Sequence, residues 1–242
     1  MQGLKEGARG VDFDRYAKGY EGEVDRSVSF TGRNSAFYAR RKVDILEEIA
    51  RPGLGSLQGL SLLDVGCGTG TSDQVLAPRV RKLHGVDVSE EMLVKAQQNV
   101  PDAEFSWYDG EKLPFDDETF DVVVAMRVLH HVPASDRCKV VSEMIRVSRR
   151  EGVVAVFEHN PYNPLTRHAV NTCELDRDAV LLPPRESVEL LRESADVDPD
   201  HRHYLFSPLG GVIGCSLDRH LRNLPFGGQY VAWVRRSAVC TR

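Results

Sequence analysis

The feature that most constrains this chain is a short apolar run followed by three alternately spaced glycines. The run is Leu62–Val65, and Gly66, Gly68 and Gly70 follow it. Such a run is typical of a strand covered on both faces of a parallel sheet. Glycine lets backbone approach a ligand where a Cβ atom would collide. The stretch predicts a buried strand, a ligand-binding loop and a helix from about Thr71, whose free N–H groups point at the ligand.

The glycine spacing argues against a nicotinamide cofactor. The dinucleotide fingerprint is G-x-G-x-x-G, whereas this chain has G-x-G-x-G with Asp64 two residues ahead. The stretch resembles the cofactor loop of the class I S-adenosylmethionine-dependent methyltransferases, whose hallmark is an acidic residue followed by x-G-x-G-x-G. Stretches at residues 84–89, 108–110 and 113–123 lie where that family would place them. The resemblance covers roughly residues 35–160.

The resemblance implies an α/β fold with a Rossmann-like seven-stranded sheet. Its strand order would be 3-2-1-4-5-7-6, with strand 7 antiparallel and helices on both faces. A chain of 242 residues is expected to form one domain. Its parts would be an N-terminal helical cap (1–50), a cofactor-binding core (51–160), a substrate-covering insertion and helix (161–200), and closing strands (201–242).

Periodicity and breakers predict the individual elements. Strands are expected at 62–65, 82–87, 103–107, 120–126, 153–157, 201–206 and 229–234. Helices are expected at 35–50, 71–77, 90–99, 136–150, 165–173 and 185–195. Pro52 and Gly53 should stop the first of these helices, and Gly152 should end the fourth. Residues 207–228, rich in Gly and Pro, are expected to form a linker.

Composition narrows the class of partner. A net charge of −5 and a pI near 5.9 give no general attraction to nucleic acid or to an anionic membrane. Five cysteines without a C-x-x-C pair indicate reduced thiols in a cytoplasmic protein. No apolar run has the length of a transmembrane helix, and no signal peptide is evident. We expect a small-molecule acceptor, no nucleic acid, no membrane, and a monomer or homodimer.

The cofactor S-adenosylmethionine, with S-adenosylhomocysteine as its product, would bind along the strand ends. Asp87 ends the second strand, where it can accept both ribose hydroxyls or simply cap a helix. Val88 and Met92 can sandwich an adenine or belong to the core. The resemblance implies that Asp109 and Gly110 bind adenine, although Asp-Gly is also a common turn. The expected cofactor residues are Tyr20, Asp64, Gly66, Cys67, Gly68, Gly70, Asp87, Val88, Met92, Asp109, Gly110 and Arg127.

Two stretches near the N-terminus, one aromatic and one basic, each allow two interpretations. In the resembling family, Tyr16 or Tyr20 would reach the methionine end of the cofactor; alternatively, the two aromatics pack an N-terminal segment. Arg40, Arg41 and Lys42 are expected to be solvated, although one of them could pair with a carboxylate of substrate or cofactor.

The acceptor end is expected where the fourth and fifth strands finish. An aliphatic hydroxyl acceptor benefits from a base, and histidine is the common choice. The candidates are His159 first, then His130 and His131, with Glu158 orienting one of them. No metal is expected, because adjacent residues on a strand face opposite ways. The proline-bracketed segment 161–184 is expected to cover the substrate.

The sequence therefore predicts methyl transfer to a small molecule, favouring a hydroxyl oxygen of a glycan or secondary metabolite. One alternative is a catalytically silent regulatory protein that binds S-adenosylmethionine. The other is an NAD(P)-dependent oxidoreductase, which the glycine spacing disfavours.

Overall fold

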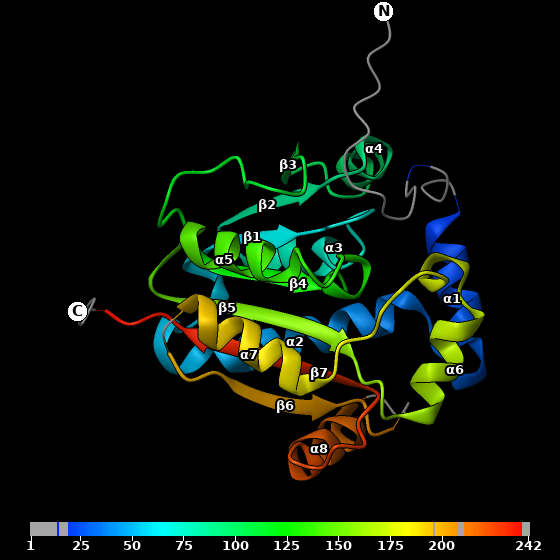
Figure 1. The fold of residues 1–242 in the computed structure, drawn as a ribbon. Coiled ribbons are helices and arrows are strands. Elements are labelled where there is room, and N and C mark those ends of the chain that lie inside the picture. Colours follow the sequence, from blue (N-terminus) through cyan, green and yellow to red (C-terminus); the bar gives the residue numbers. More distant parts are fainter. Residues whose placement is uncertain (1–13, 15–18, 196, 208–210, 239–242) are drawn as a thin grey trace, which may run out of the picture.

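A seven-stranded sheet forms the centre of the computed structural model, which describes residues 14, 19–195, 197–207 and 211–238 (Figure 1). The strand order is β3-β2-β1-β4-β5-β7-β6. All neighbours are parallel except β7, which is antiparallel to both β5 and β6. This confirms the predicted order and the direction of the seventh strand. The strands are β1 (Ser61–Val65), β2 (Lys82–Asp87), β3 (Glu104–Trp107), β4 (Phe120–Met126), β5 (Ser148–His159), β6 (Asp200–Tyr204) and β7 (Gln229–Arg235).

Helices cover both faces of the sheet, and two more lie across the ends of its strands. The helices are α1 (Tyr20–Val28), α2 (Ser35–Leu54), α3 (Asp73–Leu76), α4 (Glu90–Asn99), α5 (Arg137–Val147), α6 (Pro164–Thr172), α7 (Pro184–Ala195) and α8 (Gly211–Leu221). In Figure 1, α5 and α7 lie on one face and α2 on the other, while α1 and α6 stand at the carboxyl edge of the parallel strands.

The core has two halves because successive strand residues point to opposite faces. Val123 and Ala125 of β4 pack with α5 and α7 on one side. Val122 and Val124 of the same strand pack with α2 on the other side. All four are fully buried, as expected for a strand of a parallel sheet. The apolar runs in the sequence therefore fix which strands are central.

Three predicted boundaries were wrong. Helix α2 continues past Pro52 and ends at Leu54, where Gly55 adopts a φ of 73°. Helix α5 ends at Val147, and β5 begins at once, because Ser148 pairs with Phe120 before a register shift. The expected linker at 207–228 contains α8, whose glycines lower its intrinsic helix propensity and hid it.

The remaining boundaries match within about three residues, and β2, α4 and β4 match at both ends. Helix α3 is shorter than expected, at four residues, and 3₁₀ geometry continues it to Arg79. No helix in the described ranges has the length and apolarity needed to cross a bilayer.

Arg137 connects α5 to the segment that precedes α7. Its guanidinium is 2% exposed and donates to the carbonyls of Leu129, Val132 and Val180 at 2.8–3.0 Å. It also pairs with Glu186 at 2.6 Å. These bonds anchor the insertion beside the loop after β4.

We predict that Arg137→Met lowers the free energy of unfolding by about 3–5 kcal/mol, because it leaves buried acceptors unpaired. Urea unfolding would measure the change. The matched control is Lys139→Met on the same helix, since Lys139 is exposed and pairs with Asp136 at the surface. Equal loss in both variants would contradict the role given to Arg137.

Candidate functional site

The glycine loop after β1 has the backbone that only glycine adopts freely. Gly66, Gly68 and Gly70 have φ values of 75°, 55° and 76°. A Cβ atom on Gly66 would lie 2.6 Å from Val128, so the loop packs tightly against the end of β4. Among the described residues, a Cβ on Gly68 would meet only the ring of Tyr20, at 4.0 Å. The open side of the loop therefore faces Tyr20.

Asp87 ties this loop to the end of β2. Its Oδ2 accepts a hydrogen bond from the Gly68 N–H at 2.8 Å, and its Oδ1 accepts one from the Ser89 N–H at 3.0 Å. The side chain is 8% exposed. Each carboxylate oxygen has a second lone pair, so Asp87 can still accept hydrogen bonds from a ligand in the loop.

Two further carboxyl groups lie buried beneath the loop. Asp64 is 1% exposed and Asp73 is fully buried. Among the described residues, Asp64 Oδ1 and both Asp73 oxygens have no hydrogen-bond partner. Burial raises the pKa of Asp64 to about 7, despite the opposing effect of Lys42, and raises the pKa of Asp73 as well. The glycine loop thus rests on a pair of buried carboxyl groups that interact with each other and with Lys42.

Of the three consecutive basic residues at positions 40–42 of α2, two are buried, which corrects the prediction that they are solvated. Arg41 pairs with Asp218 of α8 at 2.5 Å. Lys42 is 2% exposed, and burial holds its pKa well below the usual range, with Arg127 acting in the same direction. Asp64, Glu158 and Asp73 are the acidic groups that raise the pKa of Lys42. Only Arg40 is exposed as expected.

The expected adenine residues have different environments. Val88 is 46% exposed beside the loop, whereas Met92 is 1% exposed and packs inside. Asp109 Oδ1 accepts hydrogen bonds from the N–H groups of Glu111 and Lys112, so it shapes a turn. Gly110 has a φ of 84°, and a Cβ there would lie 3.5 Å from Val88.

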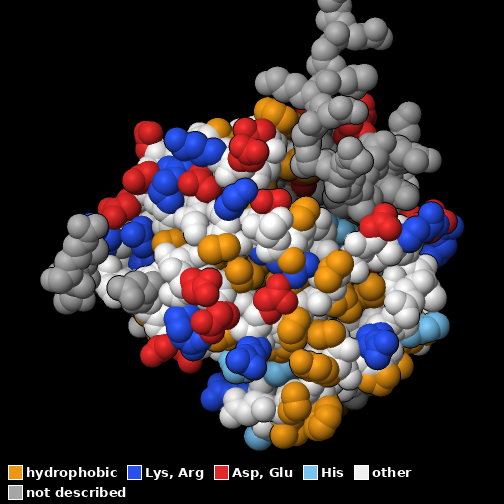
Figure 2. Space-filling view, viewed as in Figure 1, with side chains coloured by type: hydrophobic (Ala, Val, Ile, Leu, Met, Phe, Trp, Pro, Cys, Tyr) orange, Lys and Arg blue, Asp and Glu red, His pale blue; other side chains and the backbone are white. Residues whose placement is uncertain are grey.

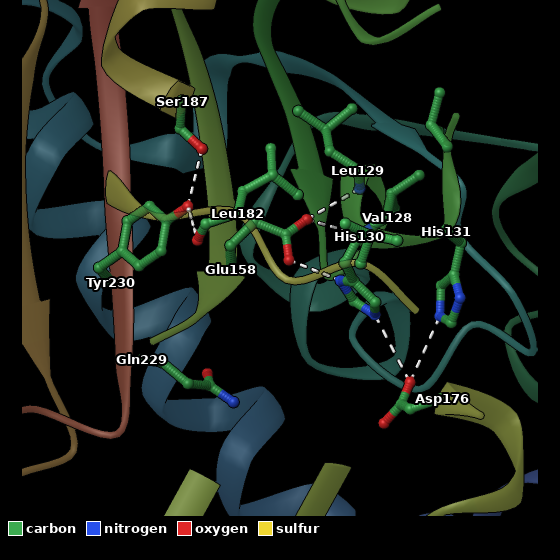
Figure 3. Close-up of polar contacts among 12 residues, drawn as sticks. Val128, Leu129, His130, His131, Glu158, Asp176, Leu182, Ser187, Gln229 and Tyr230 are labelled. Atoms are coloured by element: carbon green, nitrogen blue, oxygen red, sulfur yellow. Dashed lines mark hydrogen bonds and ion pairs between the residues drawn. The ribbon is translucent and has the colours of Figure 1, made fainter. Parts of the chain in front are cut away.

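Glu158 joins the ends of β4 and β5 (Figure 3). This carboxylate is fully buried. Its Oε1 accepts from the N–H groups of Val128 and Leu129 at 3.1 and 2.8 Å. Its Oε2 lies 2.6 Å from His130 Nδ1. The expected orienting role of Glu158 therefore has a geometric basis, and its partner is His130.

His130 and His131 point to the same side rather than to opposite sides. They lie in a 3₁₀ turn, Leu129–His131, and not on a strand. Their ring centroids are 4.1 Å apart. The Nε2 atoms lie 3.5 and 3.4 Å from the same atom, Asp176 Oδ1 (Figure 3). The strand-geometry reason for expecting no metal was therefore wrong.

These groups perturb one another strongly. Burial lowers the pKa of His130, but Glu158 and Asp176 outweigh it and raise the pKa to about 9. Burial and the neighbouring His130 lower the pKa of His131. Burial would raise the pKa of the Asp176 carboxyl, but the two histidines hold it far below its usual range.

His159 is the third histidine at this edge. It is 8% exposed, and its ring centroid lies 5.4 Å from that of His130. Burial, reinforced by His130, lowers its pKa to about 3, so the imidazole is neutral. Its Nδ1 has no hydrogen-bond partner among the described residues.

A cavity of about 50 Å³ connects these histidines to the N-terminal helix. Its lining includes all three histidines, Asp176, Arg127 and Tyr20. Arg127 has a φ of 66°, an unusual value for a residue other than glycine. Its Nε is buried without a hydrogen-bond partner in the described part of the chain. The cavity is therefore polar on the sheet side, and Tyr20, which lines it, also lies close to Gly68 of the glycine loop.

The structure thus brings most of the predicted residues to one edge of the sheet. Tyr16 lies outside the described residues. Asp176 was missed, although it falls within the expected covering segment. Its role depends on a contact 45 residues away along the chain, between positions 131 and 176, and no local pattern signals that contact.

Comparisons with known proteins show which proteins this chain resembles. Residues 62–152 match a family model described as a methyltransferase domain. Over 108 residues the chain is 43% identical to phosphatidylethanolamine N-methyltransferase of Cereibacter sphaeroides, covering 42% of this chain and 52% of that protein. Demethylmenaquinone methyltransferase of Thermotoga maritima is 31% identical over 153 residues, covering 62% of this chain and 61% of the relative. The chain spans about half the length of the first relatives that it matches.

A solved structure shares the fold along most of the chain. It is a S-adenosylmethionine-dependent methyltransferase from Thermotoga maritima, described as a possible histamine N-methyltransferase. It aligns with a TM-score of 0.63 and 19% identity, covering 93% of this chain and 98% of that one. At this identity the likeness concerns the fold alone.

We predict that the buried Asp64 contributes a loss of stability to the ligand-free protein as the pH rises from about 4 to about 7, opposite in sign to the contribution of His159 over the same interval. The pKa of Asp64 is higher in the folded state, so the folded protein holds a proton that the unfolded chain releases in this interval. Asp64→Asn should remove this contribution, measured as urea midpoints across the interval. Asp116→Asn, at an exposed carboxyl, is the control. An unchanged slope in Asp64→Asn would contradict the prediction.

Proposed function

Because the chain carries a class I S-adenosylmethionine-dependent methyltransferase domain, we propose that it transfers a methyl group from S-adenosylmethionine to a small-molecule acceptor. The favoured acceptor atom is a hydroxyl oxygen, in a molecule of the glycan or secondary-metabolite type. A silent regulatory protein that only binds S-adenosylmethionine and an NAD(P)-dependent oxidoreductase remain the alternatives.

The observation that carries the proposal is the acidic surrounding of the glycine loop. Asp64, Asp73 and Asp87 are all buried at this loop. A dinucleotide would place its negative pyrophosphate here, against three carboxyl groups and at a helix of only four residues. S-adenosylmethionine brings no phosphate and carries two positive groups, an ammonium and a sulfonium. Charge therefore favours the sulfonium cofactor.

The chain's own groups fit the parts of this cofactor. Asp87 retains lone pairs for the ribose hydroxyls. The carboxyl groups of Asp64 and Asp73, which are buried beneath the loop, suit the ammonium. Arg127, with a buried unpartnered Nε, and Lys42 suit the carboxylate. Tyr20 closes the open side of the loop. When bound, the cofactor supplies an electrophilic methyl carbon on a positively charged sulfur.

The three histidines are assigned to the acceptor end of the cavity. His130 has both nitrogens near carboxylates, which limits it as a proton acceptor. The buried Nδ1 of His159 has no hydrogen-bond partner among the described residues. We therefore assign His159 to hydrogen bonding with the acceptor hydroxyl. Positioning of the two reactants supplies much of the expected rate enhancement, about 7–11 kcal/mol at best.

A lipophilic acceptor is a second candidate. Exposed hydrophobic side chains gather around α6 and α8, near the carboxyl edge (Figure 2). They include Tyr162 (64% exposed), Leu165 (60%), Ile213 (64%) and Phe226 (66%). Relatives are described as acting on phosphatidylethanolamine and demethylmenaquinone. An acceptor with an apolar tail would use this surface.

We predict that S-adenosylhomocysteine raises the melting temperature and NADH does not. At a ligand concentration of a hundred times the dissociation constant, the gain is about 2.7 kcal/mol. Calorimetric titration and thermal melts would measure both ligands. Binding of NADH without binding of S-adenosylhomocysteine would overturn the proposal.

A matched pair of variants locates this binding. Asp87→Ala should weaken the binding of S-adenosylhomocysteine by about 1.5–3 kcal/mol, which is the usual contribution of hydrogen bonds to a charged group. Glu90→Ala, three residues on and exposed in the first turn of α4, should leave the affinity unchanged. Equal affinities in the two variants would place the cofactor elsewhere.

We predict that labelled methyl groups from S-adenosylmethionine enter water-soluble hydroxyl compounds rather than lipids. Incubation of the protein with a fractionated cell extract, followed by mass spectrometry of each fraction, would identify the product. A product in the lipid fraction would select the second candidate instead. Binding of the cofactor with no product in any fraction would favour the silent regulatory protein.

A further inference from the structure

We propose that His130, His131 and Asp176 form a binding site for a divalent transition metal of the Zn²⁺ type at the acceptor end of the cavity. The three residues each offer one ligand atom, and these atoms all lie within 4.8 Å of one another. This inference deepens the proposed function, since it concerns the same cavity.

The distances suit metal ligands better than hydrogen bonds. Each imidazole Nε2 lies 3.4–3.5 Å from Asp176 Oδ1, whereas N–H···O hydrogen bonds are about 2.7–3.2 Å. Zn–N and Zn–O bonds of about 2.0–2.2 Å at tetrahedral angles place two ligand atoms about 3.3–3.5 Å apart. The two distances from the imidazole nitrogens to Asp176 Oδ1 therefore already match those between the ligand atoms of a tetrahedral zinc site.

The surroundings of the three ligands are also those of a metal centre. Glu158 accepts at 2.6 Å from the opposite nitrogen of His130, and a carboxylate on the far nitrogen of a ligand histidine is the common second contact in zinc sites. The cavity of about 50 Å³ borders all three ligands, and a fourth ligand such as water needs only about 10–15 Å³. The site would thus be open on the acceptor side.

The donor set selects the metal. Two imidazoles and one carboxylate suit Zn²⁺, Fe²⁺ or Co²⁺, whereas Mg²⁺ and Ca²⁺ prefer oxygen ligands. A divalent cation here would act as a Lewis acid on an acceptor oxygen and lower the pKa of its hydroxyl. The histidines would then assist the acceptor by holding the metal, and no histidine would need to act as the base.

The test is a metal titration of the full chain after dialysis against a chelator. Co²⁺ serves as the probe because four-coordinate Co²⁺ absorbs visibly, and Zn²⁺ should displace it. We expect one Co²⁺ per chain in the wild type and in Asp178→Asn, a matched change at an exposed neighbouring aspartate. Mg²⁺ should neither bind nor compete.

Two variants decide the assignment. Asp176→Asn removes a ligand and should abolish the visible Co²⁺ spectrum. Glu158→Gln alters a residue that positions His130 and should lower the affinity for Co²⁺ by about 10–100-fold. Absence of Co²⁺ binding in the wild type would overturn the site. Equal Co²⁺ binding in Asp176→Asn would also overturn it, because the metal would then bind elsewhere, for example at the exposed Cys138. Either result would leave the two histidines as a proton-sharing network. S-adenosylhomocysteine binding in the same samples separates failure of this site from failure of the proposed function.

Discussion

The buried carboxylate of Glu158 is the contact on which the carboxyl edge of the sheet depends. Removing such a charge from water costs several kcal/mol unless it is fully paired. Two backbone N–H groups and His130 supply that pairing. They also fix the first turn after β4, because the N–H groups belong to Val128 and Leu129. Val128 in turn packs against Gly66, so one carboxylate positions the histidine turn and, through it, one wall of the glycine loop.

Much of this fold could be predicted from sequence because its signals are local. The apolar run at 120–126 predicted both ends of the central strand β4. Ser89, followed by two glutamates, predicted the start of α4, and its side chain caps that helix. The failures occur where tertiary contacts override local preference. Pro52 lies in the last turn of α2 and does not stop it. Ser148 joins β5 because Phe120 pairs with it across the sheet.

The site divides in the same way. The glycine loop and Asp87 lie within 25 residues of each other, so their spacing along the chain could predict a cofactor site. Lys42 and Asp176 could not be found like this. Lys42 looks like one member of a solvated basic run, and only the packing of α2 against the sheet buries it. Asp176 meets the histidines because Arg137 and the insertion bring its segment back over the edge.

The two ends of the candidate site, the glycine loop and the histidine turn, place opposite electrostatic demands on a ligand. At the glycine loop, Asp64 and Asp73 are buried together, and Lys42 opposes the rise in their pKa values only in part. At the histidine turn, a positive charge is already favoured, since Glu158 and Asp176 both face His130. A sulfonium cofactor would supply the positive charge at the loop, and a proton or a metal would supply it at the turn. Arg127 lies between these ends with an unpartnered Nε, so anionic groups of a ligand are drawn to the middle and its cationic groups to the loop. In the proposed function, this order of charges from the glycine loop to the histidine turn would set the direction in which a bound S-adenosylmethionine presents its methyl group to an acceptor.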